Sequence, residues 1–269
     1  FAIQDEISAA VVEQLKIALL GAAPTVKETD PAAYVLTLQA RQVQRQRTAA
    51  GYTQSIALYQ QALAIAPDYA AAWVGLSESY SIQAGVGLRS ITEGYTLARE
   101  AADKALVFDP DNAAAHAQLS FISMYFDGDL AAAARHIERA LQLDPANPDI
   151  YLDAADLAGS LGRTEQAVIL GEHAVSRDPV NPRGHATVGY YYSSAGRQDE
   201  AMASRRTALS LSPGMLSAHY NTGVMLLRKG EPDAALAAMQ LESEEGFRLI
   251  GSAMAYHALG QALESDAAL

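Results

Sequence analysis

Apolar residues recur along this chain at the spacing of one face of an α-helix, and no useful stretch alternates apolar and polar residues as a strand does. The first such helix covers residues 3–20 and ends at Gly21; its apolar face is formed by Ile3, Ile7, Val11, Leu15 and Leu19. Because this helix has no partner of its own, we expect residues 1–21 to cap the helices that follow. Residues 22–31 are rich in proline, threonine and charge, and are expected to form a linker.

One helical pattern occurs twice between Pro145 and Pro213, with the second copy 34 residues after the first. Glycine readily adopts the left-handed conformation at a helix C-terminus, so Gly162 and Gly196 are expected to end the first helix of each copy. Alanines seven residues apart lie on one face of the second helix and allow close packing: Ala167 with Ala174, and Ala201 with Ala208. Pro179 and Pro213 then end the second helix. Each copy is therefore predicted to be an antiparallel helix pair.

This period of about 34 residues, with small residues at set offsets and a closing proline, resembles the tetratricopeptide repeat. Residues 73–80 (Trp-Val-Gly-Leu-Ser-Glu-Ser-Tyr) are similar to the start of that repeat, and the resemblance covers nearly all of residues 32–260. It implies an all-α fold, a right-handed α-solenoid of antiparallel helix pairs. Six repeats are expected over residues 32–246, with a partial repeat or cap over residues 247–269.

Residues 1–7 (Phe-Ala-Ile-Gln-Asp-Glu-Ile), followed by Ala33-Tyr34 and the repeats, resemble the C-terminal tetratricopeptide region of bacterial multidomain signalling proteins. Those proteins place a nucleotide cyclase or a winged-helix DNA-binding domain before the repeats. Neither module is present in this sequence, so the resemblance implies neither catalysis nor DNA binding here. The first residue is Phe rather than Met, and we expect the chain to be a segment of a longer protein.

The formal net charge of −12 predicts that this segment binds no nucleic acid, which requires clustered Lys and Arg, and that it docks poorly on anionic membranes. No stretch reaches the ~18–20 uninterrupted apolar residues of a membrane span, so no membrane insertion is expected. The absence of cysteine excludes disulfides and thiolate chemistry and leaves the compartment open. The cytoplasm is favoured, and the periplasm applies if the segment follows a membrane span in the full-length protein.

The sequence offers no constellation for catalysis or cofactor binding. Residues 85–90 (Gly-Val-Gly-Leu-Arg-Ser) lack the third glycine and the preceding strand of a dinucleotide-binding loop. His116, His185 and His219 share one repeat position, but neighbouring repeats lie about 10 Å apart. That separation is too large for a shared zinc ion, whose ligands lie at ~2 Å. We therefore expect packing histidines, no metal, no cofactor and no enzyme activity.

The candidate site begins with three carboxylates, Asp149, Asp153 and Asp156, spaced to lie on one face of the first helix of the fourth repeat. In this fold first helices form the concave wall, where aromatic residues take comparable offsets on other repeats: Phe121, Tyr125, Tyr190 and Tyr220. A carboxylate row beside aromatics predicts a groove for a protein or peptide partner, basic and carrying a large apolar side chain. The competing interpretation is a solvated acidic face, with the aromatics in the core.

The sequence thus favours a non-catalytic protein–protein interaction scaffold that binds a polypeptide segment in the concave groove. The alternative is a sensory or regulatory domain that binds a small effector and controls a linked output module. The sequence predicts neither the identity of the partner nor the oligomeric state.

Overall fold

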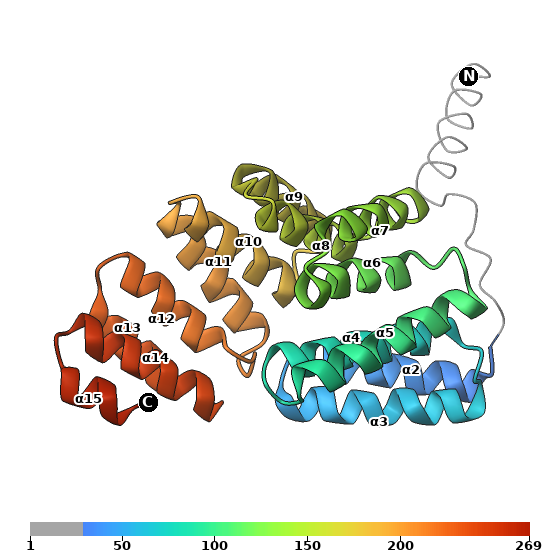
Figure 1. Cartoon of the computed structure of the whole chain (residues 1–269), viewed down its shortest axis with the longest axis horizontal. Helices are drawn as coiled ribbons and strands as arrows, with labels where there is room; N and C mark the ends of the chain where they lie inside the picture. The colour runs from blue at the N-terminus through green and yellow to red at the C-terminus, as the bar shows by residue number, and fades with distance from the viewer. Residues whose placement is uncertain (1–28) are drawn as a thin grey trace, which may run out of the picture. The chain divides into compact units, whose positions relative to one another are not determined.

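The structure is a computed structural model that describes residues 29–269. The predicted capping helix over residues 1–21 and most of the linker over residues 22–31 lie outside this range. Every regular element within residues 29–269 is helical, which confirms the predicted α-solenoid of antiparallel helix pairs (Figure 1). No helix in the described range is long and apolar enough to cross a membrane.

Fourteen α-helices, α2 to α15, form seven successive hairpins in the described residues. Each helix contacts the next along the chain, and the first helices of neighbouring hairpins also touch, α2 with α4, α4 with α6, α6 with α8 and α8 with α10. These first helices therefore build one inner layer. The hairpins are α2 (Pro31–Gln44) with α3 (Ala49–Ile65), α4 (Ala70–Gly85) with α5 (Ile91–Phe108), α6 (Ala113–Ile122) with α7 (Leu130–Leu143), α8 (Pro148–Ser160) with α9 (Thr164–Arg177), α10 (Pro182–Ser194) with α11 (Gln198–Leu211), α12 (Ala218–Arg228) with α13 (Pro232–Gln240), and α14 (Glu245–Ala258) with α15 (Ala262–Ala267).

The turns follow the local chemistry of the repeat. Gly162 and Gly196 adopt φ of 74° and 80° where α8 and α10 end, the left-handed conformation that favours glycine. After the closing Asp-Pro, an asparagine caps the next first helix: the side chains of Asn112, Asn147 and Asn181 accept hydrogen bonds from the backbone N–H of Ala115, Asp149 and Arg183. The repeated turn therefore fixes where each first helix begins and which residues occupy its first turn.

One position near the start of the first helices links three of the repeats to the turns that precede them. Trp73 Nε1 donates a hydrogen bond to the Pro67 carbonyl at 2.8 Å, and the Tyr151 hydroxyl donates to the Pro145 carbonyl at 3.0 Å. His185 Nε2 lies 2.9 Å from the Pro179 carbonyl, in the same arrangement. His185 therefore packs in the structural role that the sequence predicts.

The third hairpin departs from the regular repeat. After α6 the chain forms one π-helical turn, Ser123–Asp127, which ends at Gly128 with φ of 70°. A π-helical turn accommodates one additional residue in a helix, and such turns are frequent at functional sites. The turn places Phe121 and Tyr125 with their ring centroids 4.5 Å apart.

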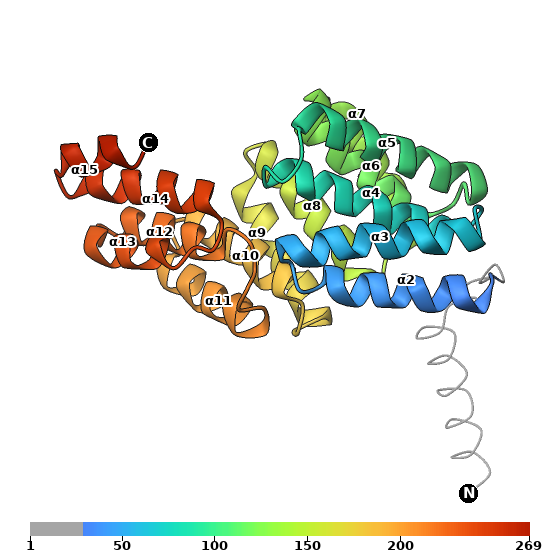
Figure 2. The same ribbon diagram turned by 90° about the horizontal axis from the view of Figure 1, so that it is seen from below.

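Residues far apart in the sequence meet at a seam, formed by the α2–α3 turn and the segment between α11 and α12 (Figure 2). The Leu216 N–H donates to the Arg47 carbonyl at 2.9 Å, and Ser212 Oγ donates to the Gln46 carbonyl at 2.7 Å across 166 residues. Arg47 and Ser217 have φ of 55° and 56°, a left-handed conformation that non-glycine residues rarely adopt. The array within residues 31–216 therefore curves until its first and fifth hairpins touch.

Ala174 and Ala208 should each tolerate no larger side chain, because they are 2% and 0% exposed on the packed faces of α9 and α11. Replacing either with leucine is expected to lower the free energy of unfolding by roughly 1–3 kcal/mol through overpacking. Urea denaturation followed by circular dichroism measures the change. Full stability in both variants would show that these alanines do not lie at a close helix contact.

Candidate functional site

The inner layer and the seam border a central cavity of about 750 Å³. Its walls come from helices α4, α6, α8 and α10, from Arg205 of α11, and from residues 215–217 at the seam. A second cavity of about 540 Å³ adjoins it. The two cavities share five lining residues, so these form the boundary between them: Arg47, Glu78, Gln118, Asp153 and Arg183.

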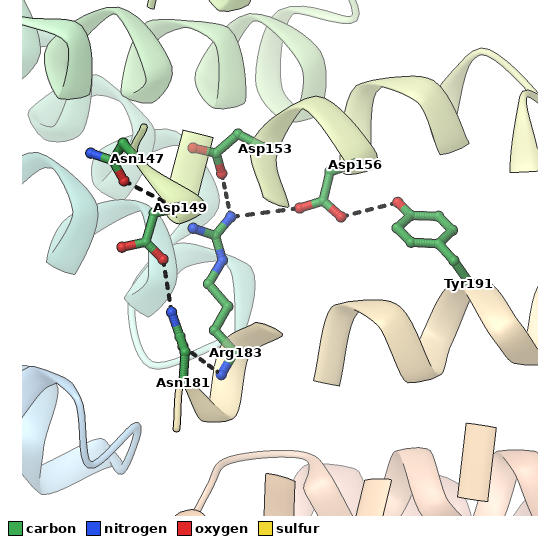
Figure 3. Close-up of polar contacts among 7 residues, drawn as sticks. All are labelled: Asn147, Asp149, Asp153, Asp156, Asn181, Arg183 and Tyr191. Carbon is green, nitrogen blue, oxygen red and sulfur yellow. Dashed lines mark hydrogen bonds and ion pairs between the residues drawn. The ribbon is translucent and has the colours of Figure 1, made fainter. Parts of the chain in front are cut away.

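An ion-pair network crosses from α8 to α10 on the cavity wall (Figure 3). The guanidinium of Arg183 donates a hydrogen bond to the Asp153 carboxylate, and its Nη2 lies 3.8 Å from Asp156 Oδ2. The Tyr191 hydroxyl donates to Asp156 Oδ1 at 3.0 Å. The side chains of Asp153 and Arg183 are 6% and 19% exposed, so their charges are largely removed from water.

The repeat turn positions this network. Asn147 caps α8 at Asp149, and Asn181 caps α10 by accepting the backbone N–H of Arg183 at 3.0 Å. Asn181 also donates through Nδ2 to Asp149 Oδ1 at 3.1 Å, which ties the starts of the two helices together (Figure 3). Because Arg183 lies in the first turn of α10, its side chain reaches back to the carboxylates of the preceding repeat.

Burial dominates the titration of these carboxylates. It raises the pKa of Asp153 to about 7, although Arg183 favours the ionised form. Burial also raises the pKa of Asp156, again against the opposing effect of Arg183. Burial and then the charge of Asp156 raise the pKa of the Tyr191 hydroxyl, which keeps that group a hydrogen-bond donor. The single guanidinium of Arg183 thus partly compensates the charges of both Asp153 and Asp156.

Asp153 should make the stability of the protein depend on pH. Because folding raises this pKa from an ordinary value of 3.8, the folded chain holds a proton that the unfolded chain has released between about pH 4 and about pH 7. The contribution of Asp153 to stability is therefore full below this window and falls as the pH rises through it. We expect Asp153→Asn to reduce the loss of unfolding free energy between about pH 5 and about pH 7.5.

The matched control for that experiment is Asp103→Asn on the exposed face of α5. It removes one carboxylate and should leave the pH dependence as in the unaltered protein. An identical pH dependence in Asp153→Asn would contradict the assignment. Urea midpoints at the two pH values provide the comparison.

The structure brings five of the seven sequence-predicted site residues to one cavity: Asp153, Asp156, Phe121, Tyr125 and Tyr190. Tyr125 and Tyr190 are about half exposed, at 51% and 49%. Asp149 borders the second cavity instead. Tyr220 lines neither cavity; its ring lies against Phe247 of α14, with centroids 5.4 Å apart. Binding of a partner by these residues stays a prediction.

Several cavity residues were missed from the sequence: Arg47, Glu78, Arg183 and Arg205. Arg205 carried a detectable signal, because it lies four residues after Ala201 and three before Ala208, on the packed face of α11. A charged residue on that face is unusual and marks a buried charge. Arg47 and Glu78 gave no such signal, since only the seam and the curvature of the array bring them to the cavity.

Comparisons with known proteins match part of the chain to a known repeat. Residues 127–189 and 189–244 each match a sequence profile described as tetratricopeptide repeat, and no curated protein matches the chain. Among solved structures, a human IFIT1 dimer with m7Gppp-AAAA is similar with a TM-score of 0.74 and 16% identity over 96% of this chain and 61% of that one. This chain thus spans about three-fifths of the IFIT1 chain.

Two further structures share the fold. The type IV pilus biogenesis factor PilW is similar with a TM-score of 0.55 and 19% identity, over 72% of this chain and 90% of its own. A thermophilic tetratricopeptide repeat protein of Thermus thermophilus, TTC0263, gives a TM-score of 0.56 and 20% identity, over 73% of this chain and 100% of its own. At these identities the likeness shows the fold alone.

The prediction that the net charge excludes a nucleic-acid partner is wrong. A solenoid similar to nearly this entire chain is solved with capped RNA, so the fold accommodates such a ligand. The net charge of −12 describes the whole chain, whereas arginines line its cavity: Arg47, Arg183 and Arg205. The prediction of a basic partner is corrected for a related reason. Asp153 and Asp156 already face Arg183 and so do not present free negative charge to a partner.

Proposed function

We propose that this tetratricopeptide solenoid is a non-catalytic binding module that holds a small effector in its central cavity and thereby regulates a larger protein. Tetratricopeptide repeats serve generally in protein–protein interaction, and the proposal is a more specific form of that general binding role. The observation that supports a small effector as the ligand is the seam. It brings the first and fifth hairpins together beside the central cavity.

The cavity has the features of a small-molecule site. Its volume of about 750 Å³ lies within the ~300–1,000 Å³ of pockets that bind small molecules. The half-exposed ring of Tyr125 lines it together with the buried carboxyls of Asp153 and Asp156, whose pKa values are raised. A bound effector would stabilise the closed array, because it contacts hairpins on both sides of the seam.

A polypeptide scaffold is the second candidate, and a separate surface favours it. On α14 the side chains of Leu249, Ile250 and Met254 are 41%, 50% and 39% exposed. The hydroxyl of Tyr220 lies 3.8 Å from the Met254 sulfur, so α12 and α14 present aromatic and aliphatic groups together. This surface lies beyond the cavity, so the two candidate functions use different residues.

A thermal-shift screen of small molecules separates the two functions. We expect compounds that raise the melting temperature of the intact chain, with the shift lost in Tyr190→Ala, which alters the cavity, and retained in Tyr220→Ala. These two tyrosines form a matched pair, since the sequence predicts both for one groove and the structure separates them. The proposal is contradicted if no compound stabilises the chain while a polypeptide binds and loses affinity only in Tyr220→Ala.

A further inference from the structure

Two arginines border the central cavity, and Arg205 has no counter-charge among the described residues. Arg205 of α11 is 4% exposed, and Arg47 is half-buried in the α2–α3 turn. The Nε of each guanidinium is buried and has no hydrogen-bond partner within residues 29–269, and neither side chain forms an ion pair with a described residue. This arrangement contrasts with that of Arg183 on the same wall, which faces two carboxylates.

The two arginines are close enough to repel each other. Burial, followed by the positive charge of Arg47, lowers the pKa of Arg205 to about 10, and no carboxylate within residues 29–269 offsets either effect. Removing one charge from water without a partner is strongly unfavourable, and a second like charge adds to that penalty. Groups perturbed in this way cluster at functional sites, where a ligand can supply the missing charge.

We propose that Arg47 and Arg205 form an oxyanion site at the seam, where the cavity binds the phosphate or carboxylate group of a small organic anion. The inference rests on the proposed function and names the class of ligand. Guanidinium groups present paired N–H donors whose geometry matches the oxygens of phosphate and carboxylate. Arg47 belongs to the first hairpin and Arg205 to the fifth, so an anion held by both bridges the seam.

The part of the ligand beyond its anionic group has aromatic surfaces in the same cavity to pack against. The half-exposed rings of Tyr125 and Tyr190 line the same cavity. A planar ring or an apolar body attached to the anionic group can pack on these faces. Asp153 and Asp156 direct their charge to Arg183. Burial raises the pKa of Glu78, which lies near Arg47 on the same wall, and so favours the uncharged form of that carboxyl.

The test uses inorganic phosphate, adenosine monophosphate and adenosine with the intact chain. Both phosphate probes should raise the melting temperature saturably, and adenosine should act more weakly than its monophosphate. Arg205→Gln should weaken phosphate binding by about 10- to 100-fold, as expected for lost charged hydrogen bonds. Arg205→Lys should recover part of that affinity. The matched control is Arg206→Gln, which removes the exposed neighbouring arginine and should bind like the unaltered chain.

A second readout separates a binding role from a structural one. Without any anion, Arg205→Met should melt about 2–4 °C above the unaltered protein, because it removes an uncompensated buried charge. A phosphate effect of equal size in Arg205→Gln and Arg206→Gln would overturn the proposal. So would a loss of stability in Arg205→Met together with unchanged phosphate binding.

Two further outcomes distinguish failure of the oxyanion site from failure of the proposed function. Neutral compounds that bind through Tyr190 while phosphate acts independently of Arg205 would refute the oxyanion site and leave the proposed function standing. A 5′-phosphorylated RNA that binds far more tightly than adenosine monophosphate, with the same loss in Arg205→Gln, would overturn the small-ligand assignment. It would instead assign the arginine pair to a nucleic-acid end.

Discussion

Arg183→Met should lower the free energy of unfolding by about 3–5 kcal/mol, the range measured when one member of a buried ion pair is removed. The substitution retains a long apolar side chain and deletes only the guanidinium. It leaves Asp153 without its charged hydrogen bond and Asp156 without the nearby cation. Urea denaturation at about pH 8, above the raised pKa of Asp153, measures the full loss because that carboxylate is then ionised.

Two variants test whether charge is the cause. Arg183→Met combined with Asp153→Asn and Asp156→Asn should recover most of the lost stability, since the uncompensated charges are removed as well. Arg177→Met, at an exposed position near the end of α9, should change stability little. If the single Arg183 variant loses less than about 1 kcal/mol, or if the asparagines give no recovery, the network is not the buried ion pair described here.

Glu242→Ala should destabilise the last hairpins by about 3 kcal/mol, since a buried carboxylate and its charged hydrogen bonds are lost. Glu242 is 2% exposed. One carboxylate oxygen accepts hydrogen bonds from the backbone N–H groups of His219 and Tyr220 at the start of α12, each at 3.2 Å. The other accepts from the Ser243 N–H at 3.1 Å. The carboxylate therefore joins the start of α12 to the α13–α14 junction. Its negative charge also interacts favourably with the dipole of α12 at the N-terminus of that helix.

Hydrogen exchange resolves where that loss occurs. Protection should fall after residue 217 in Glu242→Ala and stay unchanged in residues 113–212, because the stability of a solenoid is distributed along its repeats. Glu244→Ala is the matched control. Its carboxylate lies two residues away and accepts no backbone hydrogen bond of this kind among the described residues. Equal protection in both variants would show that Glu242 does not cap α12.

The helices were predictable because their determinants are local. Gly162 and Gly196 end first helices, Ala167 and Ala201 are fully buried, and these roles depend only on neighbours within one repeat. Residues 242–246 (Glu-Ser-Glu-Glu-Gly) lack the closing proline of the repeat, and their local pattern indicates only that the repeat ends there. Their structural role depends on Glu242 reaching residues more than twenty positions earlier, which no local pattern records.

The site was only partly predictable, for a related reason. The spacing of Asp153 and Asp156 places them correctly on the inner wall, but their partner Arg183 belongs to the next repeat. The seam depends on the sum of small rotations between hairpins, so a contact across 166 residues is not encoded at any one position. Net charge was misleading because it averages exposed acidic residues with arginines that line the cavity.

The seam is the feature on which the cavity and its proposed ligand depend, and a designed cross-link tests it most directly. A Cβ at Gly214 would lie 3.1 Å from Thr48 Cγ2, and the chain contains no cysteine of its own. In Thr48→Cys with Gly214→Cys we expect complete loss of both free thiols on mild oxidation, in a monomer with unchanged helicity. The control Thr48→Cys with Gly260→Cys should keep its thiols, because a Cβ at Gly260 meets no heavy atom within 4 Å. Persistent free thiols in the seam pair, or cross-links only between molecules, would contradict a closed solenoid and the cavity with it.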